Sequence, residues 1–170
     1  MDRFGSDKPD LRIDYELHLL DEAVKNSSFS VLSEPANDPK CRVIGFALPG
    51  GAKLTRRETD AYTDFVKKLG AGGLMTIKVT DLSRGADGVK ASFGKHVTLD
   101  EILELIKLCD AKDGDMVFIG CGPRVKTATY MGALRLKTAK DHDLVNDGYK
   151  ALWVVDFPMF EMTEEAGLTA

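Results

Sequence analysis

The chain has 170 residues, of which 44% are hydrophobic and 29% are charged, so it is long enough for one domain with its own core and a small appendage. The formal net charge of −4 argues against a protein that binds nucleic acid over its whole surface, although a local basic face stays open. With no apolar run of roughly 20 residues, a polar start and three widely spaced cysteines, we expect a cytoplasmic protein without a membrane span, a signal peptide, a disulfide framework or a metal knuckle.

The first forty residues combine loops with two short predicted elements. Residues 4–12 form a polar segment rich in turn residues, in which Pro9 excludes helical geometry for the residue before it. Apolar residues at helical spacing predict a short amphipathic helix over residues 14–25. Alternation over residues 29–32 favours a strand, and two prolines predict a loop over residues 35–40.

The rest of the chain alternates between strands and helices. Two capping boxes, Thr55 with Glu58 and Thr98 with Glu101, predict the starts of two amphipathic helices. A glycine–proline pair at residues 122–123 opens a third long helix. In chain order the predicted elements are a strand over 41–48, a helix over 55–69, a half-buried strand over 74–79, a short strand near 91–93, a helix over 98–109, a strand over 116–119, a helix over 122–142 and a strand over 152–155.

This order of elements bears on the fold class. Two neighbouring strands followed by alternating helices and strands predict an α+β fold, a two-layer sandwich in which a mainly antiparallel sheet carries helices packed on one face. A doubly wound parallel sheet would need a stricter alternation of strand and helix.

Several residue patterns resemble parts of known binding or catalytic motifs, but none of these motifs is complete. Gly120 and Gly122 follow a strand and precede a helix, as in a dinucleotide-binding loop. Val125 stands where the third glycine would be, and Pro123 lacks an amide for phosphate, so a plain turn is favoured. The three histidines have no metal-ligand spacing, and no serine lies in a nucleophile elbow. The residues alone predict no catalytic group and no metal site.

The third long helix carries the candidates for contact with RNA phosphates. Their positive charges recur along the helix and would suit a phosphate backbone. Acidic residues elsewhere in the chain, and the absence of interleaved aromatic residues, favour an ordinary solvated face instead. The candidates are Arg124, Lys126, Arg135, Lys137 and Lys140.

Four segments carry a resemblance to a known family. They are Phe4-Gly-Ser-Asp-Lys-Pro-Asp-Leu-Arg12, Leu48-Pro-Gly-Gly-Ala52, Gly132-Ala-Leu-Arg-Leu136 and Leu152-Trp-Val-Val-Asp-Phe-Pro-Met-Phe-Glu161. In this order they resemble the YGSDKPDLR, PGGA, LGALR and FLWVxDFPLFE motifs of bacterial-type aspartyl-tRNA synthetases. The resemblance spans nearly the whole chain, with Phe4 in place of tyrosine and Met159 in place of leucine.

The resemblance implies a domain organisation and a parent activity. Residues 28–146 would be the GAD insertion domain, whose fold is an α+β sandwich. Residues 1–27 would be an arm from the class II catalytic domain, and residues 147–170 would contain the strand that returns to it. The parent would be a homodimer that uses ATP and Mg²⁺ to join L-aspartate to tRNA, with no DNA or membrane partner.

The resemblance also limits what this chain does by itself. The motif arginines that hold ATP in class II synthetases are missing, so we expect the chain to be non-catalytic and to bind no cofactor. The residues beside the parent's active site would be Asp7, Lys8, Asp10, Asp156 and Glu161. The alternatives are a stand-alone RNA-binding or structural module, and a small enzyme that binds a nucleotide at Gly120–Val125. From the domain limits we expect that removing residues 1–12 and 159–170 costs little stability.

Overall fold

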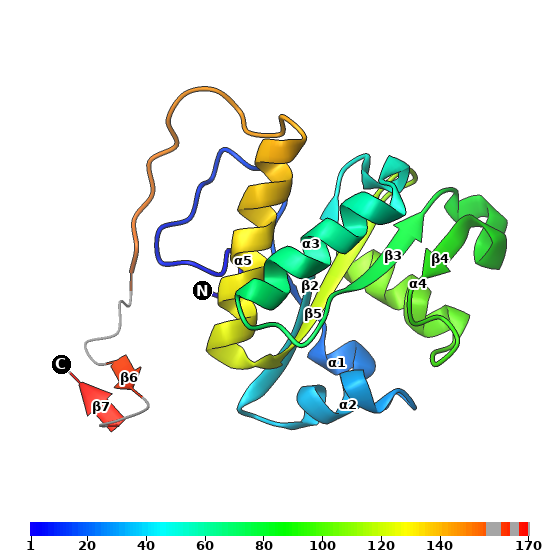
Figure 1. The fold of residues 1–170 in the computed structure, drawn as a ribbon, viewed down its shortest axis with the longest axis horizontal. Helices are drawn as coiled ribbons and strands as arrows, with labels where there is room; N and C mark the ends of the chain where they lie inside the picture. The colour runs from blue at the N-terminus through cyan, green and yellow to red at the C-terminus, as the bar shows by residue number, and fades with distance from the viewer. Residues whose placement is uncertain (156–160, 164–166, 170) are drawn as a thin grey trace.

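The computed structural model describes residues 1–155, 161–163 and 167–169. Its centre is an antiparallel sheet of five strands in the order β1-β2-β5-β3-β4 (Figure 1). These strands are β1 (His18–Leu19), β2 (Cys41–Leu48), β3 (Met75–Val79), β4 (Val89–Ala91) and β5 (Met116–Pro123). A separate hairpin pairs β6 (Glu161–Thr163) with β7 (Gly167–Thr169).

Helices cover both faces of the five-stranded sheet, because β2 contributes alternate residues to two different cores. Val43 and Ala47 pack in one apolar cluster, whereas Ile44, Phe46 and Leu48 pack in the other. The first cluster also takes residues from α1 (Asp21–Val24), α2 (Ser30–Asn37) and α4 (Leu99–Leu108), and the second from α3 (Arg56–Lys68) and α5 (Arg124–Asp141). The short 3₁₀ segments are η1 (Gly51–Lys53) and η2 (Leu82–Gly88).

The predicted α+β class and the antiparallel sheet are confirmed. The prediction that helices pack on one face needs a correction, since α3 and α5 lie on one side and α1, α2 and α4 on the other (Figure 1). The reason is that both central strands, β2 and β5, are apolar on both faces. A sheet of this kind must be covered twice.

Both predicted capping boxes are confirmed. The hydroxyl of Thr55 accepts from the amide of Glu58 at 3.3 Å, and the Glu58 carboxylate accepts from the amide of Thr55 at 2.7 Å. Thr98 and Glu101 repeat this reciprocal arrangement at the start of α4. Helices α3 and α4 therefore begin where the sequence predicted, whereas α5 begins at Arg124, two residues later than predicted, with Pro123 as its N-cap.

Three predicted elements are wrong. Residues 14–25 contain no long helix, only the two-residue β1 and the single turn α1. Residues 30–37 form the helix α2 where a strand and a loop were predicted. Residues 152–155 lie in an exposed segment without regular structure, and the following residues 156–160 lie outside the described part of the chain. In this segment the side chain of Trp153 is 93% exposed.

Helix α2 tolerates an internal proline because a thiol replaces the missing donor. Pro35 has no amide hydrogen to donate to the carbonyl of Val31, four residues earlier. The Sγ of Cys121 on β5 lies 3.3 Å from that same carbonyl oxygen and donates to it. The helix and the sheet are thus joined at the point where the helix is weakest.

The N-terminal residues belong to the core of the domain. Leu17 packs in the cluster beneath α3 and α5, whereas Leu20 and Val24 pack in the cluster on the opposite face. β1 adds the edge strand next to β2. The predicted boundary between residues 27 and 28 stays a prediction about the parent protein, but residues 17–24 fold here as part of the same unit as the sheet.

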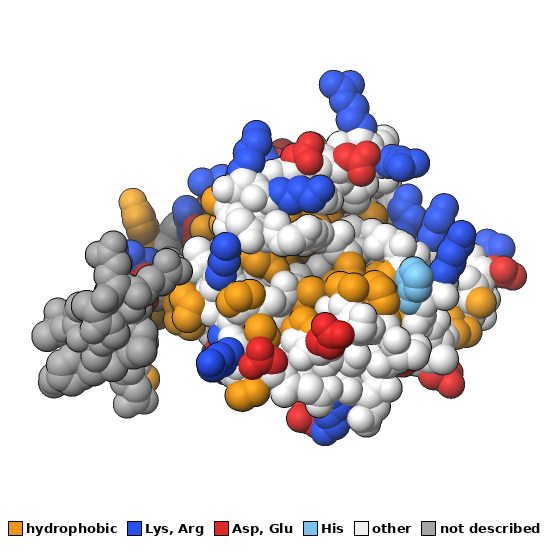
Figure 2. Space-filling view, turned by 60° about the horizontal axis from the view of Figure 1, so that its bottom comes forward, with side chains coloured by type: hydrophobic (Ala, Val, Ile, Leu, Met, Phe, Trp, Pro, Cys, Tyr) orange, Lys and Arg blue, Asp and Glu red, His pale blue; other side chains and the backbone are white. Residues whose placement is uncertain are grey.

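The surface carries both signs of charge. Lys and Arg side chains gather at the right-hand end of the face in Figure 2, which is the end where β4 lies in Figure 1. Apolar side chains form a band across the middle of the same face. Among the helices of the described residues, none combines the length and apolarity needed to cross a membrane.

Candidate functional site

The N-terminal segment lies against helix α5 (Figure 1). Their closest approach is between Gly5 and Gly132, where a Cβ on Gly132 would stand 2.5 Å from the carbonyl oxygen of Phe4. Gly5 has φ of +66°, and a Cβ there would stand 2.0 Å from the carbonyl oxygen of Ala128. Only glycine fits at both positions, because any side chain would separate the segment from the helix.

Arg135 of α5 holds this segment through its backbone. Its Nε donates to the carbonyl of Tyr15 at 2.6 Å, and its Nη2 donates to the carbonyls of Asp10 at 3.1 Å and Ile13 at 3.0 Å. The guanidinium also lies 5.0 Å from the centre of the Phe4 ring. Arg135 is 1% exposed, and burial lowers the pKa of its guanidinium. A single buried cation thus organises residues 4–15.

A second buried arginine anchors the start of the segment. Arg42 on β2 is 5% exposed, and its Nη1 donates to the carboxylate of Asp2 at 2.6 Å. This hydrogen bond from Arg42 lowers the pKa of Asp2. A bidentate pair between Arg3 and Glu16, with both distances 2.6 Å, closes the segment into a loop. Removing residues 1–12 was expected to cost little stability. These residues instead supply hydrogen-bond acceptors to the buried guanidinium groups of Arg42 and Arg135.

The predicted site-adjacent residues have different environments. Asp7 and Lys8 are exposed, and the amide of Lys8 donates to the Ser6 hydroxyl at 3.0 Å, as in a local turn. Asp10 is half-buried and its backbone binds Arg135. Asp156 lies outside the described residues, and Glu161 lies in β6 with only its backbone described. Of the five predicted residues, Asp7, Lys8 and Asp10 therefore lie together, on the N-terminal segment.

The carboxylate of Asp10 makes the stability of this segment depend on pH. Its hydrogen bonds with the Arg12 side chain, at 3.0 Å and 2.7 Å, are the main cause that lowers its pKa from 3.8 to about 2. Because the folded-state pKa is depressed, the stabilisation is present above the unfolded pKa of about 3.9 and is lost as the pH falls toward 2. We expect Asp10→Asn to flatten the fall in unfolding free energy between about pH 4 and pH 2.

Urea unfolding at a series of fixed pH values measures this effect. Asp7→Asn is the matched control, since it removes an exposed carboxylate three residues away. A pH profile of Asp10→Asn that coincides with that of the unmodified chain would contradict the assignment.

The five predicted RNA-contact residues of α5 do not form one surface. Arg135 is wrong as an RNA contact, because it is buried and its donors bind backbone carbonyls. Lys137 is partly buried, paired with Asp141 at 3.0 Å, and lies over the rings of Tyr62 and Phe65.

The other three candidates on α5 are exposed but far apart. The aliphatic part of Lys126 lies over Gly70, just beyond the end of α3. Arg124 and Lys140 are both exposed. They are separated by 16 residues, which is roughly 24 Å along a helix at 1.5 Å per residue. Helix α5 therefore presents single cations rather than a basic patch.

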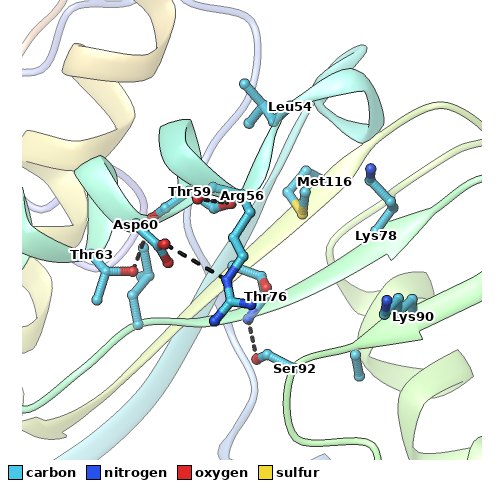
Figure 3. Close-up of a pocket in the computed structure, with 12 residues that line it drawn as sticks. Leu54, Arg56, Thr59, Asp60, Thr63, Thr76, Lys78, Lys90, Ser92 and Met116 are labelled. Atoms are coloured by element: carbon cyan, nitrogen blue, oxygen red, sulfur yellow. Dashed lines mark hydrogen bonds and ion pairs between the residues drawn. The ribbon is translucent and has the colours of Figure 1, made fainter.

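A more concentrated set of cations lies between α3 and the outer strands of the sheet (Figure 3). A hollow of about 450 Å³ opens there, with α3 as its wall and β3 and β4 as its floor. Its cations are Arg56, Lys78 and Lys90, and Asp60 is the one carboxylate that lines it. We call this hollow the α3–β4 groove. Its remaining lining residues are Leu54, Thr59, Thr63, Leu74, Thr76, Ala91, Ser92 and Met116.

Sequence reasoning missed this groove, although part of its signal was visible. The alternation in β3 predicted Thr76 and Lys78 on one face and Ile77 on the other, and the structure confirms both orientations. The missing information was that β4 pairs with β3 in a register that sets Lys90 opposite Lys78. Pairing across a loop cannot be derived from the composition of either strand.

The remaining chemical candidates have structural explanations. Gly120 is required because a Cβ there would stand 2.7 Å from the hydroxyl of Tyr130, which donates to the carbonyl of Cys121. His96 stacks on Phe29 with ring centres 4.8 Å apart. Within residues 1–155, 161–163 and 167–169, no three His, Cys, Asp or Glu side chains are grouped so that they could hold a metal ion.

The family model described as the GAD domain matches residues 32–131, which are 100 of the 170 residues and therefore more than half of the chain. The match begins in α2 and ends within α5, so it includes β2, β5 and the whole α3–β4 groove.

Proposed function

Because the chain belongs to the GAD domain family, which is associated with class II aminoacyl-tRNA synthetases, we propose that it is the insertion domain of a bacterial-type aspartate–tRNA ligase. In this proposal residues 1–27 and 147–170 are pieces of the catalytic domain. The parent is a cytoplasmic homodimer that attaches L-aspartate to tRNA with ATP and Mg²⁺. The chain by itself is non-catalytic.

One observation carries the proposal. The two segments that resemble ligase motifs, Phe4–Arg12 and Gly132–Leu136, contact each other through Arg135 and through Gly5 and Gly132. They are more than 100 residues apart in the chain, so a chance resemblance at both places would not bring them together. The contact gives the insertion domain a mechanical role, which is to fix the segment that bears Asp7, Lys8 and Asp10.

The exposed residues before the undescribed part of the chain also support the proposal. Trp153 is 93% exposed and Val155 is 74% exposed. Large apolar side chains are rarely left bare over consecutive residues unless they meet another surface. In the proposed parent, that surface is supplied by strands of the catalytic domain.

Aspartate-dependent ATP–pyrophosphate exchange tests the proposal. We expect the purified chain to show no exchange above a buffer blank, because the positive groups that would stabilise the adenylation transition state are not in it. We expect the longer product of the same gene to catalyse exchange with aspartate. Exchange by the chain alone would overturn the non-catalytic assignment, and a longer product without aspartate-dependent exchange would overturn the parent assignment.

A further inference from the structure

The α3–β4 groove exists because the helices of one layer do not cover the whole sheet. On this face, the cluster beneath α3 and α5 takes residues from β2 and β5, such as Phe46 and Phe118, but none from β3 or β4. Thr76 and Lys78 of β3 point to the same face and line the groove instead. A polar floor therefore stays open beside the wall formed by α3 (Figure 3).

Two of the positive charges in this groove are neighbours and repel each other. Lys78 and Lys90 are direct cross-strand partners, and both line the groove. Like charges in this arrangement repel and destabilise the strand pair. Arg56 adds a third positive charge from α3, and its only ion pair with a described residue is a long one of 3.8 Å to Asp60. Across the described residues, no carboxylate lies within 4.0 Å of either lysine's amine.

Three cations and one carboxylate line this hollow, although the chain as a whole has a net charge of −4. An anionic ligand would remove the repulsion between the lysines, so the arrangement is complementary to negative charge. The volume of about 450 Å³ exceeds what a lone phosphate group needs and falls within the range of sites that hold larger ligands. Because the cations come from three separate elements, they suit several phosphates better than one.

We propose that the α3–β4 groove binds the phosphodiester backbone of RNA through Arg56, Lys78 and Lys90. The partly exposed side chain of Leu74 lies beside these cations and offers apolar contact for a sugar or base between phosphates. The choice of RNA as the ligand rests on the proposed function, to which the groove adds a binding surface, and it does not depend on which amino acid the parent attaches.

Binding of fluorescently labelled, unfractionated tRNA to the chain tests this proposal. Lys78→Gln with Lys90→Gln should weaken binding about tenfold at roughly 50 mM salt, since two charged phosphate contacts are lost. The slope of log affinity against log salt should fall by about 1.4 if each contact contributes about 0.7. Asp60→Asn should tighten binding, because it removes the acidic residue of the groove.

Lys126→Gln with Lys140→Gln is the matched control. It removes the same two charges from α5, outside the groove, and should change affinity by less than about twofold. Denaturant unfolding of Lys78→Gln with Lys90→Gln should give a midpoint equal to or above that of the unmodified chain, because the repulsion is gone. This result separates lost binding from lost folding.

An effect of the α5 pair that equals or exceeds that of the groove pair would overturn the inference, and so would the absence of any tRNA binding. Binding to the unmodified chain that about 1 mM inorganic phosphate abolishes would also overturn it, because it would indicate a simple anion site. None of these outcomes bears on aspartate-dependent exchange. The parent assignment and the groove therefore fail or stand separately.

Discussion

Replacing Arg135 by alanine is expected to lower the free energy of unfolding by about 3–5 kcal/mol. Three backbone carbonyls, those of Asp10, Ile13 and Tyr15, would lose their donor. Each buried acceptor left without a partner costs about 1–3 kcal/mol. The variant would also lose the contact between the guanidinium and the Phe4 ring. Urea unfolding followed by far-UV circular dichroism measures the change.

Two further variants show whether geometry or charge is responsible. Arg135→Lys keeps the charge but supplies one compact ammonium in place of a planar fork, so it should restore less than half of the lost stability. Lys140→Ala removes an exposed cation of the same helix and should stay within about ±0.5 kcal/mol. Equal stability of Arg135→Ala and Lys140→Ala would show that the N-terminal segment does not depend on Arg135.

Replacing Phe118 by alanine should cost about 3–5 kcal/mol, and replacing Ile77 by alanine about 2–5 kcal/mol. Both side chains are 0% exposed, but they lie in the two different cores on opposite faces of the sheet. Phe118 also packs against the rings of Phe46 and Tyr62, with centres 5.6 Å and 5.8 Å away. Truncating either residue leaves a cavity that the neighbouring strands cannot close.

Together, Phe118→Ala and Ile77→Ala test whether helices cover both faces of the sheet. If helices covered only one face, the variant on the other face would lose little stability. Val125→Ala is the control, because that side chain is 71% exposed and should change stability by no more than about ±0.5 kcal/mol. Guanidinium unfolding midpoints with equal slopes are the measurement. If either core variant behaves like Val125→Ala, the face that it tests is not a core.

The sequence predicted the elements whose signals are local. The helices α3 and α4 each begin with a reciprocal cap that uses residues three apart, and their apolar stripes face the sheet. Strands β2 and β5 are apolar over most of their length, and β2 ends at a turn. For these elements the chemistry that decides the conformation lies within one or two turns of chain.

The predictions failed where neighbouring residues belong to different cores. Leu17, Leu20 and Val24 have helical spacing, but Leu17 packs on one face of the sheet and the other two pack on the opposite face. The segment passes around the edge of the sheet, so its spacing is unrelated to a helix. In α2, Pro35 suggested a loop because the thiol that replaces its donor comes from Cys121, 90 residues away from Val31.

The candidate site shows the same division between local and distant information. Arg135 was predicted to face solvent because charged side chains usually do. Its burial results from carbonyls that lie 120 to 125 residues earlier in the chain. The α3–β4 groove needs three elements in contact, and only one of them, β3, showed its polar face in the sequence.

The distance between Tyr15 and Arg135 also sets the order in which the chain can fold during synthesis. These residues are 120 positions apart, so at roughly 5–20 residues per second the ribosome needs about 6–24 s to deliver the second after the first. Strand β2 likewise cannot pair with β5 until β5 has been synthesised. During that interval the carbonyls of residues 10–15 have no Arg135 to bind, and the edge of β2 opposite β1 has no partner strand. The contacts that join residues 10–15 to Arg135 can therefore form only after α5 has left the exit tunnel.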